Sequence, residues 1–377
     1  MKQEQLDRLA DQIVCDSLQI TGGERVMIDL TGDADDLAEA VMERIAAVGG
    51  VAQVRIQSQR LNRALITQAD KNLFAQWAKW ECERQEACDA YLSIKAEENI
   101  YELADVPKEK YDLYRQHYLQ PLTISMAGMK KWLLIRYPTY GMAQLAKLSF
   151  TELTSRYFQS CTLPYGRLRE RAKPLIDLLQ RTEKVRIVGP QTDLQFSIAG
   201  MSSFLCDGRY NLPDGELFTA PLLDSVEGQI SFNIPTSYLG MPFEQVRLRF
   251  SKGKVIEAEG NDREGLQRIL ETDAGSSRVG EFGIGLNPVI DRPMNNLLFD
   301  EKMAGSIHLA LGHAYEMADN GNRSAVHWDL VLCQSAAYGG GELWFDGQLI
   351  RKDGRFVLRE LRELDEWHME DGIWLES

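Results

Sequence analysis

The order of strand and helix signals along the chain is the feature that most limits its fold. Up to about residue 183, short apolar strand candidates alternate with amphipathic helix candidates. The segment ERVMIDL (24–30) is followed by a helical pattern (33–50), which begins with acidic residues and ends at two glycines, and then by VAQVRIQ (51–57). Strand, helix and strand in this order are typical of a right-handed βαβ unit. We therefore predict an N-terminal α/β domain, residues 1–183, with a mostly parallel sheet.

Beyond residue 183 the pattern changes to short, often alternating apolar segments separated by Gly, Pro, Asn and Asp. One helix is expected near 262–272. The segment LWFDGQLIRKDGRFVL (343–358) contains two Asp-Gly pairs, which favour tight hairpin turns. We predict a C-terminal, mostly antiparallel β-rich domain, residues 184–377, as the catalytic domain. A chain of 377 residues exceeds what one hydrophobic core usually holds, in agreement with two domains.

Composition excludes several classes of protein. The net charge of −14 disfavours nucleic acid and anionic membrane surfaces as partners. No apolar run approaches the roughly 18 residues that span a bilayer, and the first residues do not resemble a signal peptide. The six cysteines are scattered without a CxxC pair, which predicts reduced thiols in a cytoplasmic protein. HExxH, P-loop and GxSxG motifs are absent from the sequence.

Side chains with metal-ligand chemistry interrupt otherwise apolar strands of the C-terminal half. In SAVHWDLVL, His327 and Asp329 share one face because strand side chains alternate, and a buried carboxylate needs a partner or a cation. His308 in SIHLALG and Glu281 in GEFGIG each share a face with small residues, and Glu216 follows a Pro-Asp-Gly turn. Each residue alone is also consistent with a hydrogen-bonded structural role. Together they indicate a metal site.

Four ordered motifs carry a resemblance to a known family: NLPDGELFTAP, GEFGIGLNP, SIHLALGHAY and NRSAVHWDLV. With them the chain resembles the M29 family of metallo-aminopeptidases, the group of aminopeptidases T and S, over nearly its whole length. The resemblance implies a homodimer and peptide substrates with a free N-terminus. The loop EMADNGNRSA (316–325) departs from the Gly-Gly-Lys-rich turn of the family, which puts substrate specificity in doubt. The ligands that the resemblance implies for two divalent metals are Glu216, Glu281, His308, Tyr315, His327 and Asp329.

Six candidate ligands exceed the four of one tetrahedral zinc, which favours a two-metal site. Two divalent ions, three carboxylates and a bridging hydroxide would be nearly neutral, which lowers the cost of burial. The ligand set suits Zn²⁺, Co²⁺, Mn²⁺ or Mg²⁺. Such a site would activate water for release of N-terminal residues. Tyr315 is a weak ligand or an oxyanion donor, or else a core tyrosine, and Glu301 is the candidate general acid/base, or else part of a solvated turn.

Two other functions are compatible with parts of this pattern. His308, His327 and Asp329 also form the two-histidine, one-carboxylate set of non-haem Fe(II) oxygenases, so a ring-cleaving dioxygenase is the alternative enzyme. Glu216 and Glu281 count against it, because a single iron does not need them. The third possibility is a non-catalytic scaffold or peptide-binding protein that is stabilised by metal.

Overall fold

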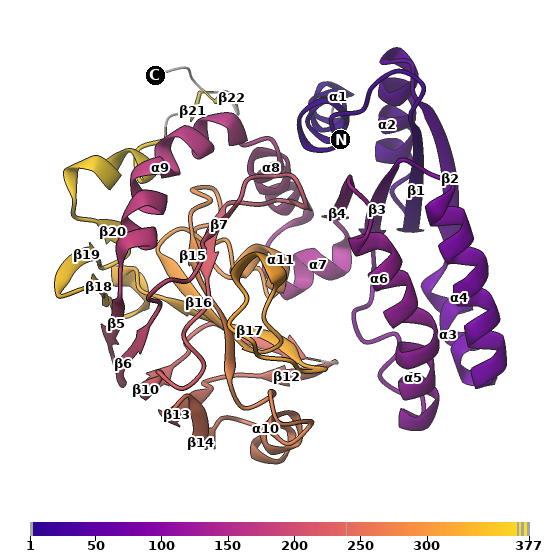
Figure 1. Cartoon of the computed structure of the whole chain (residues 1–377). Coiled ribbons are helices and arrows are strands. Elements are labelled where there is room, and N and C mark those ends of the chain that lie inside the picture. The colour runs from indigo at the N-terminus through magenta and orange to yellow at the C-terminus, as the bar shows by residue number, and fades with distance from the viewer. Residues whose placement is uncertain (1–2, 239, 368, 371–372, 375–377) are drawn as a thin grey trace. The chain divides into compact units, whose positions relative to one another are not determined.

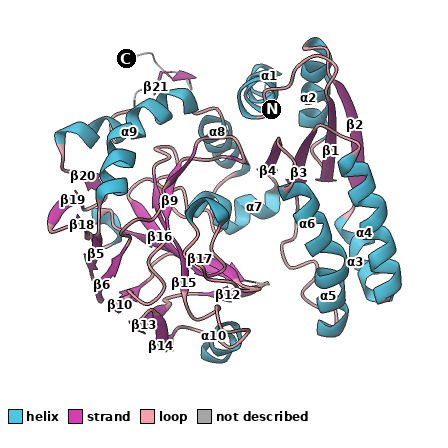
Figure 2. Ribbon diagram, in the orientation of Figure 1, coloured by secondary structure: helices cyan, strands magenta, loops and turns pink. Residues whose placement is uncertain are grey.

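The computed structural model describes residues 3–238, 240–367, 369–370 and 373–374. The chain forms two compact units: Met1–Thr162 with Gly208–Pro213, and Leu163–Asp207 with Asp214–Ser377 (Figure 1). Helices and parallel strands make up the first unit, and most strands belong to the second (Figure 2). The predicted domain boundary after residue 183 stays a prediction.

The first unit is built on a five-stranded sheet in the order β2-β1-β3-β4-β8, in which all neighbours are parallel. The predicted parallel sheet is confirmed. Strand β8 was not expected, because its short segment enters this sheet from a distant part of the chain. The strands are β1 (Arg25–Gly32), β2 (Val51–Gln57), β3 (Ala90–Ala96), β4 (Trp132–Arg136) and β8 (Asn211–Leu212).

Local chemistry sets several helix ends in the first unit. The side chains of Ser58, Asp70, Thr139 and Ser149 each accept a hydrogen bond from a backbone N–H in the first turn of the following helix. The helical segments are α1 (Gln3–Asp11), η1 (Gln12–Ser17), α2 (Asp35–Ala47), α3 (Gln59–Gln68), α4 (Lys71–Glu86), α5 (Lys108–Tyr114), η2 (Arg115–Leu119), α6 (Gln120–Ala127), α7 (Tyr140–Leu145) and α8 (Phe150–Cys161).

The second unit is mostly antiparallel, as predicted, with one large sheet, one central sheet and two short strand pairs, β11-β12 and β21-β22, among the described residues. A large sheet has the order β14-β13-β10-β6-β5-β18-β19-β20, and a central sheet has the order β17-β16-β15-β9-β7. The strands of the large sheet are β5 (Lys184–Gly189), β6 (Thr192–Ser197), β10 (Glu227–Ser231), β13 (Arg247–Ser251), β14 (Lys254–Glu259), β18 (Glu342–Phe345), β19 (Gln348–Lys352) and β20 (Arg355–Phe356). Those of the central sheet are β7 (Phe204–Cys206), β9 (Glu216–Thr219), β15 (Val279–Gly285), β16 (Ser306–Gly312) and β17 (His327–Cys333).

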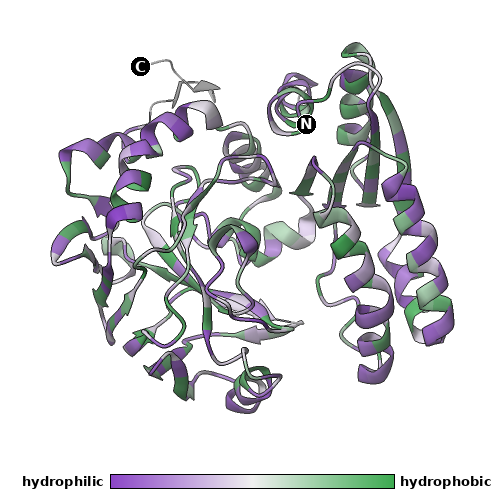
Figure 3. Ribbon diagram, in the orientation of Figure 1, coloured by the Kyte–Doolittle hydropathy of each residue, from purple (hydrophilic) through white to green (hydrophobic). Residues whose placement is uncertain are grey.

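Smaller elements complete the second unit. Along α9, buried leucines alternate with exposed charged residues, so both hydropathy colours follow its length in Figure 3. The helix expected near 262–272 is α10. The remaining elements are β11 (Thr236–Tyr238), β12 (Met241–Phe243), β21 (Met369–Glu370), β22 (Ile373–Trp374), α9 (Tyr165–Arg181), α10 (Arg263–Leu270), α11 (Leu297–Asp300), η3 (Glu316–Ala318), η4 (Ala336–Tyr338) and η5 (Arg359–Leu364).

The two Asp-Gly pairs form the predicted hairpin turns between β18, β19 and β20. Asp346 and Gly347 have φ angles of 48° and 82°, and Asp353 and Gly354 have 49° and 81°. Two successive residues with positive φ match the twist of adjoining antiparallel strands, and Gly adopts this conformation without a steric penalty. Local sequence therefore predicts these two turns, while the pairing of β18 with β5 joins segments that are distant in sequence.

Side-chain direction on β17 follows the predicted alternation, although every residue of the strand after His327 is buried. Trp328 is fully buried and its ring centroid lies 4.8 Å from that of Phe243. His327 and Asp329 project from the opposite face. All six cysteines are free thiols. Across the described ranges, no helix combines the length and apolar character needed to cross a bilayer.

Candidate metal centre

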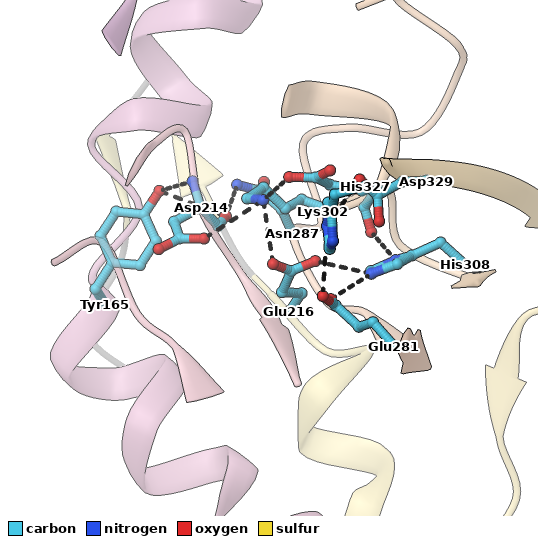
Figure 4. Close-up of polar contacts among 10 residues, drawn as sticks. Tyr165, Asp214, Glu216, Glu281, Asn287, Lys302, His308, His327 and Asp329 are labelled. Atoms are coloured by element: carbon cyan, nitrogen blue, oxygen red, sulfur yellow. Dashed lines mark hydrogen bonds and ion pairs between the residues drawn. The ribbon is translucent and has the colours of Figure 1, made fainter. Parts of the chain in front are cut away.

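The register of the central sheet gathers the predicted ligands. Ala310 on β16 lies opposite both Glu281 on β15 and Asp329 on β17, while His308 lies opposite Gly283. Side chains directly opposite one another on neighbouring antiparallel strands lie on the same face. Because the positions between the ligands carry small residues, carboxylates from the flanking strands can approach the histidines, as Figure 4 shows.

Two groups of potential ligands share Glu281. His308 Nε2 lies 3.1 Å from one Glu281 oxygen and 3.4 Å from Glu216 Oε2. His327 Nε2 lies 3.8 Å from the other Glu281 oxygen and 3.6 Å from Asp329 Oδ2. In each group, Glu216–Glu281–His308 and Glu281–His327–Asp329, the candidate ligand atoms all lie within 4.8 Å of one another. Glu281 is therefore a member of both groups.

Both imidazoles are oriented by backbone carbonyls through their other nitrogen. His308 Nδ1 lies 3.1 Å from the carbonyl oxygen of Glu301, and His327 Nδ1 lies 2.9 Å from that of His313. A proton on Nδ1 donates to the carbonyl and leaves the Nε2 lone pair facing the carboxylates, which is the usual arrangement of metal-binding histidines. The backbone of His313 therefore serves the cluster, which its sequence position did not reveal.

The donor set fits a cation. Glu216, Glu281 and Asp329 are 5%, 3% and 6% exposed, so three carboxylates are withdrawn from water together. The second oxygens of Glu216 and Glu281 are buried without a hydrogen-bond partner. Burial raises the pKa of Glu281, and in His308 the opposing effect of burial is outweighed by Glu281 and Glu216, which raise its pKa to about 10. Divalent ions would balance the same negative charge.

Lys302 is a member of the site that the sequence did not single out. It is fully buried, and its ammonium contacts Glu301 and lies 3.3 Å from Glu216 and 3.8 Å from Asp214. Burial lowers its pKa, but Glu216, Glu301 and Asp214 together raise it well above the ordinary value. The run of charged residues from Asp300 to Lys302 is also compatible with a solvated surface turn. That interpretation is wrong, because Asp300 is 2% exposed and Lys302 is fully buried.

Hydrogen bonds fix the turn before β9, which contains Asp214, one of the carboxylates near Lys302. Tyr165 on α9 accepts a hydrogen bond from the Asp214 backbone N–H at 2.8 Å, and the Asn287 side chain donates to the Asp214 carbonyl at 2.7 Å (Figure 4). These bonds fix the turn that aims Glu216. Such contacts join segments far apart along the chain and leave no local sequence signal.

The two predicted catalytic residues lie beside the cluster. Burial raises the pKa of Glu301 to about 8, and its carboxylate contacts Lys302. Tyr315 stands at the edge, with its ring centroid 4.5 Å from that of His327. The residue as a whole is 43% exposed, while burial of its hydroxyl, followed by Glu281 and Asp329, raises the pKa of Tyr315 well above the ordinary value. Its role stays a prediction. His313 is partly buried, and His368 lies outside the described residues.

Comparison with known proteins then decides the family. The model of the family described as thermophilic metalloprotease (M29) matches residues 2–356. The chain belongs to the M29 metalloprotease family. The family predicted from the four motifs is thereby confirmed, and with it the enzyme class at the level of the family, a metallopeptidase.

The relatives of this M29 protein include curated aminopeptidases. Aminopeptidase T from Thermus thermophilus is 31% identical over 179 residues, 41% of this chain and 43% of that protein, so less than half of its length is matched. Aminopeptidase 2 from Geobacillus stearothermophilus is 25% identical over 409 residues, 94% of this chain and 95% of that protein.

Two solved structures share the fold of this M29 protein. Wild-type AmpT from Thermus thermophilus has a TM-score of 0.79 at 22% identity and covers 94% of this chain and 99% of its own. A 2,5-dihydroxypyridine dioxygenase from Pseudomonas putida has a TM-score of 0.61 at 13% identity and covers 96% and 100%. At these identities both comparisons show the fold alone. The predicted mixed α/β architecture is confirmed.

Gly283 gives a direct test of the packing around His308. A Cβ built on Gly283 would overlap the His308 imidazole, which crosses this position. Gly283→Ala is therefore expected to displace the ring and to lower metal affinity and activity about 10–100-fold, the usual cost of disturbing a residue that supports a metal site. Gly166→Ala is the matched control, because a Cβ there meets nothing within 4 Å. Metal content and kcat/KM measure both effects, and equal values for the two variants would contradict this packing.

Proposed function

We propose that this M29 protein is a metal-dependent aminopeptidase that releases N-terminal residues from peptides through a two-metal site. The observation that carries the proposal is the sharing of Glu281 between two groups of candidate ligands, all buried except the half-buried His327. One group alone would serve one ion. The proposed ligands are Glu216, Glu281, His308, His327 and Asp329, with Tyr315 as a weak sixth. Zn²⁺, Co²⁺, Mn²⁺ and Mg²⁺ all suit these donors.

Divalent ions held there would supply a water of lowered pKa and would polarise the scissile carbonyl. The chain provides the rest. The free α-amine of a peptide N-terminus could bind one of these ions or a nearby carboxylate, which supports selection of chain ends. Tyr315 stands at the exposed edge, where its hydroxyl can donate a hydrogen bond to the oxyanion of the tetrahedral intermediate.

Glu301 is proposed as the group that moves a proton to the leaving amine. Two observations support this role: burial raises the pKa of Glu301 to about 8, and its carboxylate contacts the Lys302 ammonium, which lies 3.3 Å from Glu216. A carboxyl group that is withdrawn from water and adjoins the ligands is well placed for general acid/base catalysis. Lys302 holds the carboxylate in place and acts as a positioning residue.

Metal content and exopeptidase activity test the proposal together. We expect about two divalent ions per chain by elemental analysis and hydrolysis of aminoacyl-p-nitroanilides. Chelation should abolish hydrolysis, and Zn²⁺ or Co²⁺ should restore it. The matched substrate is the same p-nitroanilide with an acetylated α-amine, which should not be cleaved because it lacks the ammonium group. One ion per chain would contradict the dinuclear site, and equal cleavage of the acetylated substrate would contradict selection of chain ends.

The dioxygenase alternative draws on the shared fold and on His308, His327 and Asp329. Within the described residues, the candidate ligand groups do not unite these three side chains, since His308 belongs to one group and His327 with Asp329 to the other. This arrangement favours the peptidase. Oxygen uptake with Fe(II) and a dihydroxylated aromatic substrate separates the two functions. The homodimer and the cytoplasmic location stay predictions.

A further inference from the structure

The parallel sheet of the first unit has an unusual polar face. Val26, Ile28 and Leu30 of β1 are buried on one face, as expected for a sheet covered by helices. The alternate positions of the same strand carry Asp29 and Thr31, which are 6% and 9% exposed. Strands β2 and β3 continue this polar face. Burying so many polar groups costs free energy unless each has a partner.

Part of this polar face is internally satisfied. The Asp29 carboxylate accepts hydrogen bonds from the Arg55 guanidinium at 3.1 and 2.9 Å and from the Tyr91 hydroxyl at 2.8 Å. Gln57 also donates to it, and the other side of Arg55 contacts Glu81 on α4. The charges of Asp29 and Arg55 are therefore compensated within this network. We call the network of Asp29, Arg55, Gln57, Tyr91 and Glu81 the polar wall.

Two polar side chains beside the polar wall lack partners. Gln85 on α4 is 2% exposed, and its Oε1 is buried without a hydrogen bond. Among the described residues, no hydrogen bond or ion pair engages the ammonium of Lys95 near the end of β3. Burial lowers the pKa of Lys95, Arg136 adds to this effect, and Glu97 and Asp29 oppose it. Arg136 and Glu97 already pair with each other, so neither neutralises Lys95.

Lys95 and Gln85 line one cavity of about 330 Å³, within the range of small-molecule sites. Glu97, which pairs with Arg136, and Glu102 also line it. Asp29, Arg55, Gln57 and Tyr91 of the polar wall form one side of the cavity. The helical side supplies apolar surface from Leu119, Leu122 and Met126, and the stacked rings of Tyr114 and Tyr118, whose centroids are 5.2 Å apart. All residues lining the cavity belong to the first unit.

The sheet topology places one end of this cavity where ligands usually bind. The chain runs from β1 outward to β2 and then returns to β3 on the other side of β1, so the order reverses between β1 and β3. In open parallel sheets, ligands bind beyond the carboxyl ends of the strands at such a reversal. Thr31 and Lys95 line the cavity from the carboxyl ends of these two strands.

We propose that this cavity is a second binding site, which takes a small organic carboxylate with an aromatic or apolar body. The carboxylate pairs with Lys95, the body packs against Tyr114, Tyr118 and Leu122, and a hydroxyl or N–H group of the ligand donates to Gln85 Oε1. No residue that lines this cavity belongs to the candidate metal centre. The proposed binding does not depend on peptidase activity.

Calorimetric titration of the full chain with 3-(4-hydroxyphenyl)propionate tests the site. Carboxylates also bind metal ions, so the titration is made with chelator present. We expect one saturable site per chain with a dissociation constant of about 1 mM or below. Lys95→Met should weaken binding at least about tenfold, because it removes a charged hydrogen-bond partner. Tyramine, which carries an ammonium group in place of the carboxylate, should not bind.

Two further comparisons make the test specific. Lys79→Met is the matched control, since Lys79 lies on α4 with its side chain 68% exposed, and it should bind the probe like the parent. Gln85→Leu should weaken the hydroxylated probe but not 3-phenylpropionate. Thermal unfolding by circular dichroism checks that each variant folds, and Lys95→Gln replaces Lys95→Met if the latter does not. Absence of saturation, or equal binding by parent and folded Lys95 variants, would overturn the proposal.

Discussion

Glu281→Gln is expected to remove bound metal and to lower kcat/KM about 10³-fold, since metal ions contribute several kcal/mol of transition-state stabilisation. Glu281 is a member of both candidate ligand groups, so on the proposed function the loss of its charge weakens both at once. Glutamine keeps the size of the side chain, and the surrounding packing is therefore retained. Metal content after dialysis and kcat/KM on an aminoacyl-p-nitroanilide measure the two effects.

Two other Glu→Gln variants separate loss of metal from loss of proton transfer. Glu301→Gln should retain both metals and lose about 10²-fold in kcat, because it removes a proton-transfer group and leaves the proposed ligands intact. Glu257→Gln on β14 is the neutral control, since its side chain is 61% exposed. If the Glu281 variant kept two ions per chain, the bridging role would be wrong. If the Glu301 variant kept its kcat, Glu301 would have no part in proton transfer.

Lys302→Met is expected to destabilise the second unit by about 3–5 kcal/mol, the cost of leaving buried charges without their partner. Lys302 is fully buried among Glu301, Glu216 and Asp214, and methionine fills a similar volume without the charge. Urea unfolding followed by tryptophan fluorescence measures the change. Chelator is present throughout, because metal bound only to the folded state would add its own stabilisation.

The control for Lys302 is a lysine whose charge is solvated. Lys173 on α9 has its side chain 59% exposed, and Lys173→Met should change the free energy of unfolding by no more than about 0.5 kcal/mol. A loss below about 1 kcal/mol in Lys302→Met would show that the neighbouring carboxylates take up protons and do not depend on the lysine.

Some features of this protein follow from the sequence alone. The alternation around Trp328 placed His327 and Asp329 on one face, and the two Asp-Gly pairs placed the hairpin turns. Strand and helix periodicity also predicted the parallel and antiparallel sheets. These features depend on residues within a few positions of one another, so local spacing is enough to predict them.

Other features were decided only by the tertiary structure. The burial of Lys302, the carbonyls that orient both histidines, and the close approach of His308 to Gly283 each join segments that are distant in sequence or held apart by a turn. The cavity around Lys95 arises in the same way, from alternate positions of neighbouring strands. Sequence periodicity predicts which side chains lie on the same face of a strand or helix. Strand order and register decide which faces meet, and these are set by packing of the whole chain.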